Sequence, residues 1–233
     1  MLLTLPIRDV LPATPRTRVV RLDLQGHHFP YLAGQAALLG MPGHDRRRAY
    51  SIAGAPEDAA NLGALEFLIG VDPTTGHPAQ LSLMPGSLLD VEGPVGRFTF
   101  PDDTDATRLL FVAGGSGIAP LRAMLHHALR TRTSRIDVVY SARTAQDFAF
   151  IEELQTLDRE GRIALHQTVT REPESSGWSG GTGRLTGAAI APLLDPAHTL
   201  CFVCGPQSMV KDVPALLMSH GMARNRVRIE EWG

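Results

Sequence analysis

Residues 114–120 read Gly-Gly-Ser-Gly-Ile-Ala-Pro and lie between an apolar run, 109–113, and a segment with helical periodicity, 118–129. Glycines at such a strand-to-helix turn let a phosphate approach the backbone N–H groups at the helix start, where the helix dipole also favours an anion. A dinucleotide-binding turn usually has a third glycine where this chain has Pro120, although proline suits the first turn of a helix. The pattern predicts a nucleotide-phosphate site; a glycine turn needed only for packing is the alternative.

A basic residue, Arg143, occupies a position where many NAD-specific domains have an acidic one. The predicted strand that ends at Tyr140 is followed by Ser-Ala-Arg143. An acid here would bond the ribose 2′-hydroxyl, whereas a guanidinium group can pair with a 2′-phosphate. Arg171 and Arg184 flank a later loop and would add to this charge if the fold brings them together. These residues favour NADPH as the ligand; solvated surface arginines are the alternative.

A second candidate site is the tetrapeptide Arg48-Ala49-Tyr50-Ser51 on a predicted strand. On a strand, Arg48 and Tyr50 point to one side and Ser51 to the other. An arginine suits a pyrophosphate, and an aromatic ring suits the face of a flavin or ribose. Taken alone, the tetrapeptide is better explained as an ordinary strand with a surface arginine.

The two cysteines, Cys201 and Cys204, have the C-x-x-C spacing of many metal and redox sites. The sequence contains no second cysteine pair to complete four thiolate ligands, and residues three apart on a strand point to opposite faces. The nine histidines are scattered along the chain. We therefore expect no metal site.

Composition limits the function classes. The chain has 233 residues, of which 43% are hydrophobic and 20% charged, which suits one large domain or two of ordinary size. A formal net charge of −2 gives no general affinity for nucleic acid or an anionic membrane. The apolar runs are too short to cross a bilayer, and we expect a cytoplasmic protein.

The first hundred residues show short alternating apolar runs separated by Gly and Pro, which is typical of antiparallel strands in a small barrel or sandwich. The predicted strands are 18–24, 35–41, 48–53, 65–71 and 88–92, and one helix is predicted over 79–84. The polar stretch 101–105 marks the expected domain boundary.

After residue 107 strands alternate with helices, which predicts a parallel α/β sheet. The predicted strands are 109–113, 136–140, 163–169 and 199–204, and the helices are 118–129, 149–157 and 207–219. The loop 172–183 is rich in Gly, Ser and Pro and is a candidate for ligand contact.

Four short motifs follow one another: Arg48-x-Tyr50-Ser51, Gly93-Pro94-x-Gly96, residues 114–120 and Cys204-Gly205-Pro206-x-x-Met209. In this order they resemble the ferredoxin–NADP reductase family across almost the whole chain. The resemblance implies an FAD-binding β-barrel domain at 1–101 and an NAD(P)-binding α/β domain at 102–233.

The resemblance also implies the flavin contacts. Arg48 would hold the FAD pyrophosphate, Tyr50 would lie against the isoalloxazine, Ser51 would hydrogen-bond near flavin N5, and Ser116 would approach from the other domain. Further FAD contacts are implied for Ala49, Phe67, Leu68, Ile69, Gly76, His77 and Pro78, with His77 at a place where Ser or Thr is usual.

For the nucleotide, the resemblance places Cys204 beside the nicotinamide, and the arginines are similar to those of bacterial NADPH-dependent members. Trp232 would stack over the flavin and move aside before hydride transfer, with Glu230 as a nearby acid, so the implied catalytic set is Ser51, Cys204, Glu230 and Trp232. The implied NADP contacts are Gly115, Gly117, Ile118, Pro120, Ser141, Arg143, Arg171, Arg184, Cys204, Gly205, Pro206 and Met209.

The implied activity is hydride transfer from NADPH to bound FAD, followed by transfer of single electrons to a ferredoxin, a flavodoxin or an oxygenase component. Acidic carriers would dock on a basic surface, for which the candidates are Arg16, Arg18, Arg21, Arg46 and Arg47. We expect a monomer or weak dimer. The alternatives are an NAD(P)H-dependent free-flavin reductase, an electron-transfer subunit of a larger complex, and a non-catalytic nucleotide sensor.

Overall fold

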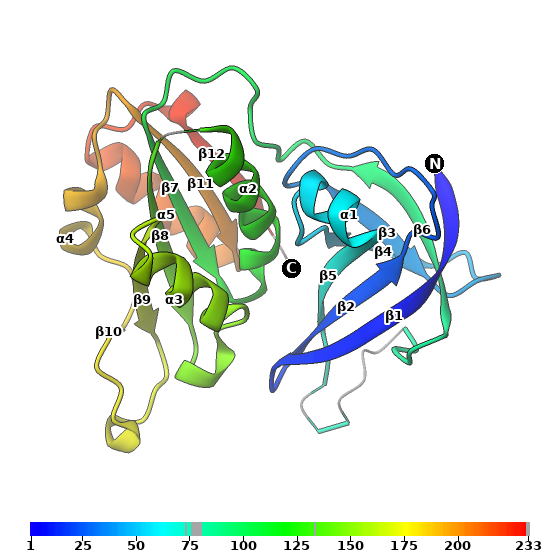
Figure 1. Cartoon of the computed structure of the whole chain (residues 1–233). Coiled ribbons are helices and arrows are strands. Elements are labelled where there is room, and N and C mark those ends of the chain that lie inside the picture. The colour runs from blue at the N-terminus through cyan, green and yellow to red at the C-terminus, as the bar shows by residue number, and fades with distance from the viewer. Residues whose placement is uncertain (73, 76–80, 133, 232–233) are drawn as a thin grey trace. The chain divides into compact units, whose positions relative to one another are not determined.

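The computed structural model describes residues 1–72, 74–75, 81–132 and 134–231 (Figure 1). The chain divides into two compact units: residues 1–100 with 122–127, and residues 101–121 with 128–233. The division after Phe100 lies beside the polar stretch 101–105, and a short part of one helix, 122–127, groups with the first unit. None of the helices in the described ranges is long and apolar enough to cross a membrane.

The first unit is built on six strands paired in the order β4-β3-β6-β1-β2-β5, and every pairing along this order is antiparallel. A bridge between Ile52 and Phe67 joins the end of β4 to β5 and closes the sheet into a barrel. The strands are β1 (Leu2–Thr14), β2 (Thr17–Asp23), β3 (Ala36–Gly40), β4 (Arg47–Ser51), β5 (Ala64–Gly70) and β6 (Leu88–Val95). The predicted antiparallel barrel is confirmed.

Alternating strand residues fill the barrel. Leu5 and Ile7 on β1, Val20 and Leu22 on β2, and Phe67 on β5 are at most 1% exposed and belong to one core cluster. Burying each such side chain contributes about 1.5–3 kcal/mol relative to leaving it in water. The core thus fixes the register of each strand, because a slip of one residue would turn these side chains outward.

One local prediction for this half is wrong, and two elements were not predicted. The described residues of the predicted helix 79–84, which are 81–84, have no helical structure. A helix that was not predicted, α1 (Pro56–Leu62), begins with proline at its first position and ends at Gly63 in a left-handed conformation, φ 60°. Its seven residues are too few to show helical periodicity. The long strand β1 was also missed.

A buried carboxylate ties the first unit together. Glu66 on β5 is 5% exposed and lies between two arginines, with Arg21 Nε 2.8 Å from Oε2 and Arg122 Nη1 2.7 Å from Oε1. Arg122 Nη1 also donates a hydrogen bond to the carbonyl oxygen of Ala53 at 2.8 Å, two residues beyond β4. Two of the nine histidines also bond to carboxylates: His126 to Asp58, and His127 to Glu57.

The second unit is a six-stranded parallel sheet with the order β10-β9-β8-β7-β11-β12. Its strands are β7 (Arg108–Gly114), β8 (Arg135–Ala142), β9 (Ala164–Val169), β10 (Gly181–Thr182), β11 (Thr199–Gly205) and β12 (Val227–Glu231). Its helices are α2 (Ile118–Thr131), α3 (Ile151–Arg159), α4 (Gly187–Ile190) and α5 (Gln207–Ser219). The parallel α/β prediction is confirmed, although β10, β12 and α4 were not foreseen.

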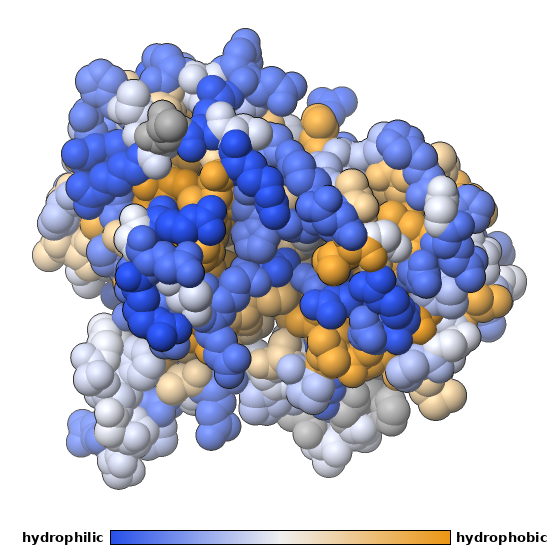
Figure 2. Space-filling model, viewed as in Figure 1, coloured by the Kyte–Doolittle hydropathy of each residue, from blue (hydrophilic) through white to orange (hydrophobic). Residues whose placement is uncertain are grey.

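The strand order reverses direction at β7. Strands β8, β9 and β10 lie on one side of it, and β11 and β12 lie on the other. Accordingly α3 and α5 cover opposite faces of the sheet (Figure 1). Ligands of such folds bind at the carboxyl ends of the two strands where the order reverses, here β7 and β11. The visible face of this unit is mostly hydrophilic (Figure 2).

The Glu66 cluster predicts a large effect on stability. Replacing Arg122 with methionine would leave the buried Glu66 with one cation and free the Ala53 carbonyl, at a cost of about 3 kcal/mol in the free energy of unfolding. Urea denaturation followed by circular dichroism measures this. The matched control is Arg130→Met at an exposed position of α2, which should cost less than about 1 kcal/mol. Equal losses in the two variants would refute a special role for Arg122.

Candidate functional site

The end of β4 carries a buried hydroxyl that lacks a partner. Ser51 is 6% exposed, and its Oγ atom has no hydrogen-bond partner among the described residues. A buried hydroxyl left unpaired costs about 1–3 kcal/mol. A ligand group that donates or accepts a hydrogen bond here would remove this cost, so the residue is suited to binding.

Two neighbouring arginines on β4 have different environments. Arg47 pairs with Asp90 at 3.1 Å and Glu92 at 3.5 Å, so its charge is used within the barrel. Arg48 is exposed, and no carboxylate in the described part of the chain lies within ion-pair distance of it. Burial raises the pKa of the Tyr50 hydroxyl, and the charge of Arg48 opposes this. The strand thus offers a free cation, a neutral phenol ring and a buried hydroxyl.

The predicted contacts on β5 differ from one another in exposure. Phe67 and Ile69 are fully buried and belong to the barrel core, whereas Leu68, 6% exposed, does not belong to that cluster. A ligand would therefore reach this strand through its backbone or through Leu68. Ala49 is exposed. The predicted contacts Gly76, His77, Pro78 and Trp232 lie outside the described residues.

In the second unit, β7 is followed by one turn of 3-10 helix, η1 (Gly115–Gly117), and then by α2. No side chain in the described ranges caps the start of α2, and Pro120 is its third residue. Gly115 has a φ of 54°, and no described atom lies within 4 Å of the place where its side chain would be. Ser116 is exposed. The N–H of Ile118 donates to carbonyl oxygens of the turn and Pro120 has no N–H, so an anion such as a phosphate would be bound here by the neighbouring amides.

Glycines also bring the ends of β7 and β11 together. A Cβ atom on Gly117 would collide with the carbonyl oxygen of Cys204, and one on Gly205 would lie 3.1 Å from the Gly114 Cα atom. The Met209 side chain packs against Gly114 and Gly205 and fills the remaining space. Cys204 is fully buried. The predicted residues of both motifs therefore meet at one edge of the sheet.

The fold brings together two of the three predicted arginines. The N–H of Arg171 donates to the carbonyl oxygen of Arg143 at 2.8 Å, and both side chains are exposed. Arg184 follows Gly183, whose N–H bonds Val169 O at 2.7 Å, but its guanidinium lies 3.5 Å from Asp212 on α5. This pair is mostly exposed and contributes little stability, so Arg184 can exchange partners. We call Arg143, Arg171 and Arg184 the arginine rim.

Sequence reasoning missed an aromatic column beside these residues. The Tyr140 hydroxyl donates to Gly115 O at 3.1 Å and accepts from the N–H of Ala149 at 3.0 Å. Burial raises the pKa of this hydroxyl. Phe148 packs edge-on against Tyr140 with ring centroids 4.9 Å apart, and Trp178 stacks on Phe148 at 5.7 Å. The available signals were a tyrosine near the end of a strand and an aromatic residue in a glycine-rich loop.

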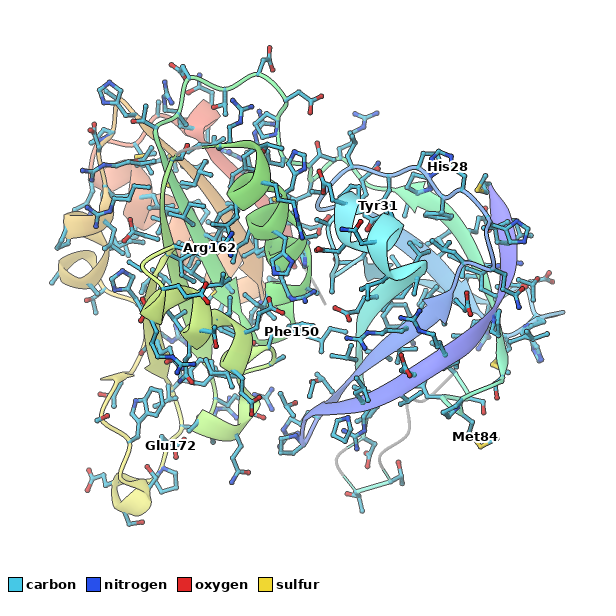
Figure 3. All side chains as sticks on the ribbon, viewed as in Figure 1. His28, Tyr31, Met84, Phe150, Arg162 and Glu172 are labelled. Carbon is cyan, nitrogen blue, oxygen red and sulfur yellow. The ribbon has the colours of Figure 1, made fainter. Side chains whose placement is uncertain are left out.

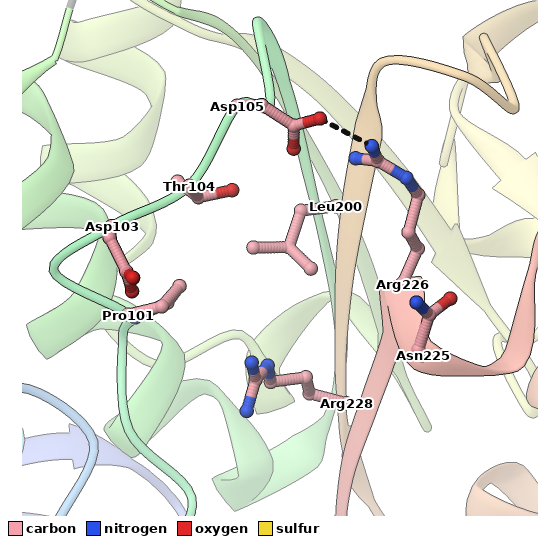
Figure 4. Close-up of a pocket in the computed structure, with 8 residues that line it drawn as sticks. All are labelled: Pro101, Asp103, Thr104, Asp105, Leu200, Asn225, Arg226 and Arg228. Carbon is pink, nitrogen blue, oxygen red and sulfur yellow. Dashed lines mark hydrogen bonds and ion pairs between the residues drawn. The ribbon is translucent and has the colours of Figure 1, made fainter.

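A separate pocket of about 420 Å³ lies at the amino ends of β11 and β12 (Figure 4). Leu200 lines it from the start of β11, four residues before Cys204, and Arg228 lines it from β12. Arg226 pairs with Asp105 at 2.8 Å and lowers the pKa of that carboxyl. This pocket lies at the opposite edge of the sheet from the 114–117 turn and is not the nucleotide crevice.

Comparisons with known proteins agree with this geometry. Residues 111–214 match the family described as the oxidoreductase NAD-binding domain. The chain is 32% identical over 237 residues to ferredoxin–NADP reductase B of Sorangium cellulosum (strain So ce56), covering 96% of this chain and 94% of that one. It is 29% identical to the propane 2-monooxygenase reductase component of Gordonia sp. (strain TY-5), covering 95% and 67%. The structure of a Neisseria gonorrhoeae ferredoxin NADP⁺ reductase with bound FAD and NADP has a TM-score of 0.78 at 22% identity, covering 99% and 98%.

The unpartnered hydroxyl of Ser51 should affect stability and flavin affinity in different ways. Ser51→Ala should leave the flavin-free protein equally stable or up to about 1 kcal/mol more stable, because an unsatisfied buried group is removed. The same change should weaken flavin binding by about tenfold, because a hydrogen bond made only with the ligand is lost. Denaturation of the flavin-free protein and fluorescence titration with FAD test the two effects. Ser87→Ala, on the same barrel, should change neither, and a loss of stability in Ser51→Ala would contradict the assignment.

Proposed function

The chain belongs to the ferredoxin–NADP reductase family, and from this premise we propose that it binds FAD on its barrel and NADPH on its parallel sheet and delivers electrons to a separate carrier protein. As a member of this family it is an oxidoreductase that moves electrons from NAD(P)H through a flavin to a partner. The residue roles, the preference for NADPH and the type of carrier are the proposed parts.

The observation that carries the proposal is the buried Ser51 hydroxyl on the same strand as the free cation Arg48. We assign Arg48 to the FAD pyrophosphate, Tyr50 to the face of the isoalloxazine, and Ser51 to a hydrogen bond near flavin N5. Bound FAD would supply the conversion between hydride transfer and single-electron transfer. The contribution of these side chains is to bind the cofactor and hold its ring in one orientation.

At the sheet, the glycine turn η1 and the start of α2, which has no side-chain cap among the described residues, suit the pyrophosphate of a dinucleotide. We assign the pyrophosphate to this turn and the nicotinamide to the end of β11 at Cys204 and Gly205. The fully buried Cys204 would exclude water there. Glu230 on β12 is in register with Cys204, which supports its assignment as the nearby acid. Trp232 remains our proposed cover for the flavin face.

The preference for NADPH rests on the arginine rim. Arg143 and Arg171 are exposed and adjacent through a backbone hydrogen bond, so two guanidinium groups are available to one 2′-phosphate. A hydrogen bond to a charged group contributes about 1.5–3 kcal/mol. Two such contacts would favour NADPH over NADH strongly, and Arg184 could leave Asp212 to add a third.

We propose a ferredoxin, a flavodoxin or an oxygenase component as the electron acceptor, guided by the named roles of the Sorangium and Gordonia proteins. Three of the arginines expected on the docking surface have partners within the barrel. Arg21 is paired with Glu66, and Arg47 with Asp90 and Glu92. The Arg18 guanidinium donates to the carbonyl oxygens of Thr14 and Thr17.

The nucleotide preference is tested by substituting the rim. Arg143→Ala and Arg171→Ala should each raise the dissociation constant for NADP⁺ by about tenfold or more and leave that for NAD⁺ within about twofold. Titration monitored by flavin difference spectra measures both constants. Arg162→Ala, an exposed arginine of the same unit (Figure 3), is the control and should change neither. An unchanged ratio of the two constants would refute the 2′-phosphate assignment.

Electron transfer is tested by anaerobic mixing of the FAD-loaded protein with NADPH. Rapid bleaching of the flavin absorbance is expected, because bound FAD would be reduced by the hydride that NADPH supplies. Binding of NADPH without bleaching would instead support a nucleotide sensor.

A further inference from the structure

We propose that Trp178 is a positioning residue for the arginine rim. It holds the three backbone segments that carry these arginines, here called the arms of the rim, in the arrangement that binds a 2′-phosphate. The inference rests on the NADPH preference proposed above. Trp178 lies in the loop between β9 and β10 and is half-buried, and its indole contacts the segment that follows Arg143 and the segment that precedes Arg184.

The first contact joins Trp178 to the arm of Arg143. The indole stacks on Phe148 with ring centroids 5.7 Å apart and planes 23° apart. Phe148 is 2% exposed and follows Arg143 by five residues, so it provides a fixed surface. Stacked aromatic pairs contribute stability beyond their buried area. The loop is thus attached to the segment that carries Arg143.

The second contact joins Trp178 to the arm of Arg184. The indole Nε1 donates to the carbonyl oxygen of Gly181 at 2.9 Å. Gly181 pairs with Thr168 on β9, and the Thr168 hydroxyl donates to Gly183 O at 3.0 Å. A Cβ atom on Gly180 would lie 2.8 Å from Cε2 of the indole, so glycine is needed for the ring to fold back over the chain.

The arm of Arg171 is attached by hydrogen bonds of the loop backbone. The backbone N–H of Trp178 donates to Ser176 Oγ at 3.2 Å, a bond that does not depend on the indole ring. Glu172, labelled in Figure 3, accepts a hydrogen bond from the N–H of Ala145 at 2.6 Å. This bond links the start of the loop to the segment after Arg143, and Trp178 links its end to the same segment.

These contacts reduce the ordering that the nucleotide must impose. Long exposed arginine side chains lose rotamer freedom on binding, and a loose loop would add the cost of ordering its backbone. With Trp178 in place, the loop backbone is already ordered before the ligand binds, so binding does not have to supply the free energy of ordering it. Removing the ring should therefore weaken only the 2′-phosphate contact. Tyr140 has a different role, because its hydroxyl holds Gly115 in the pyrophosphate turn that NADP and NAD share.

The experiment uses the full-length, FAD-loaded protein and two soluble probes in calorimetric titrations. Adenosine 2′,5′-bisphosphate contains the 2′-phosphate, and adenosine 5′-monophosphate lacks it. Trp178→Ala should weaken the first probe by about tenfold and the second by less than about twofold. Trp178→Phe keeps the stacked ring and should recover most of the affinity, to within about threefold of the unaltered protein. Tyr140→Phe should weaken both probes by the same factor.

A second measurement follows the loop itself and needs no bound probe. The amides of Arg171 and Gly183, which bond Arg143 O and Val169 O, should exchange hydrogen faster in Trp178→Ala, while amides of β7 keep their protection. The inference is overturned if Trp178→Ala weakens both probes equally, if it weakens neither, or if exchange in the loop is unchanged. The outcome for the proposed function is separate. Arg143→Ala and Arg171→Ala that fail to weaken the bisphosphate would refute the NADPH preference directly.

Discussion

The close approach of the backbones at the ends of β7 and β11 is the constraint on which the nucleotide half of the molecule depends. Gly117 has no room for a side chain because the carbonyl oxygen of Cys204 occupies that space, and a Cβ atom on Gly205 would lie 3.1 Å from the Cα atom of Gly114. This contact places the start of α2 beside the start of α5 at the point where the strand order reverses. The start of a helix and a buried thiol then share one edge of the sheet. Any larger residue at these glycines would separate the two turns.

Two sets of arginines in this chain differ in their partners. Arg21 and Arg122 pair with the buried Glu66, and Arg47 pairs with Asp90, so these three stabilise the barrel. Removing such a partner leaves a buried charge and costs about 3–5 kcal/mol. Arg48, Arg143 and Arg171 are exposed, with no ion pair to another residue that the structure describes. These three are therefore among the cations that phosphate groups of ligands could reach.

The fold was largely predictable because its signals are local. Alternation with a period of two indicated the barrel strands, and the change to alternating strands and helices after residue 107 indicated the parallel sheet. The misses have physical causes. Helix α1 has seven residues and depends on its caps, while β10 and α4 are too short to show a pattern. Strand β1 mixes proline and charged residues with its apolar ones, and it is a strand because β2 and β6 pair with it.

By itself the sequence determined the two-domain architecture, the family and the candidate motifs, because glycine turns and strand patterns involve residues that are close together in the sequence. Only the tertiary structure decided which polar groups are left for a ligand. Ser51 and Arg48 stand out only in the folded chain, because burial and ion pairing are properties of the fold, as the contrast between Arg47 and Arg48 shows. The adjacency of Arg143 and Arg171, and the position of Trp178 among the arms of the rim, arise from pairing between segments far apart in sequence. Such long-range contacts leave no pattern in a single sequence, because the residues that make them become neighbours only when the chain folds.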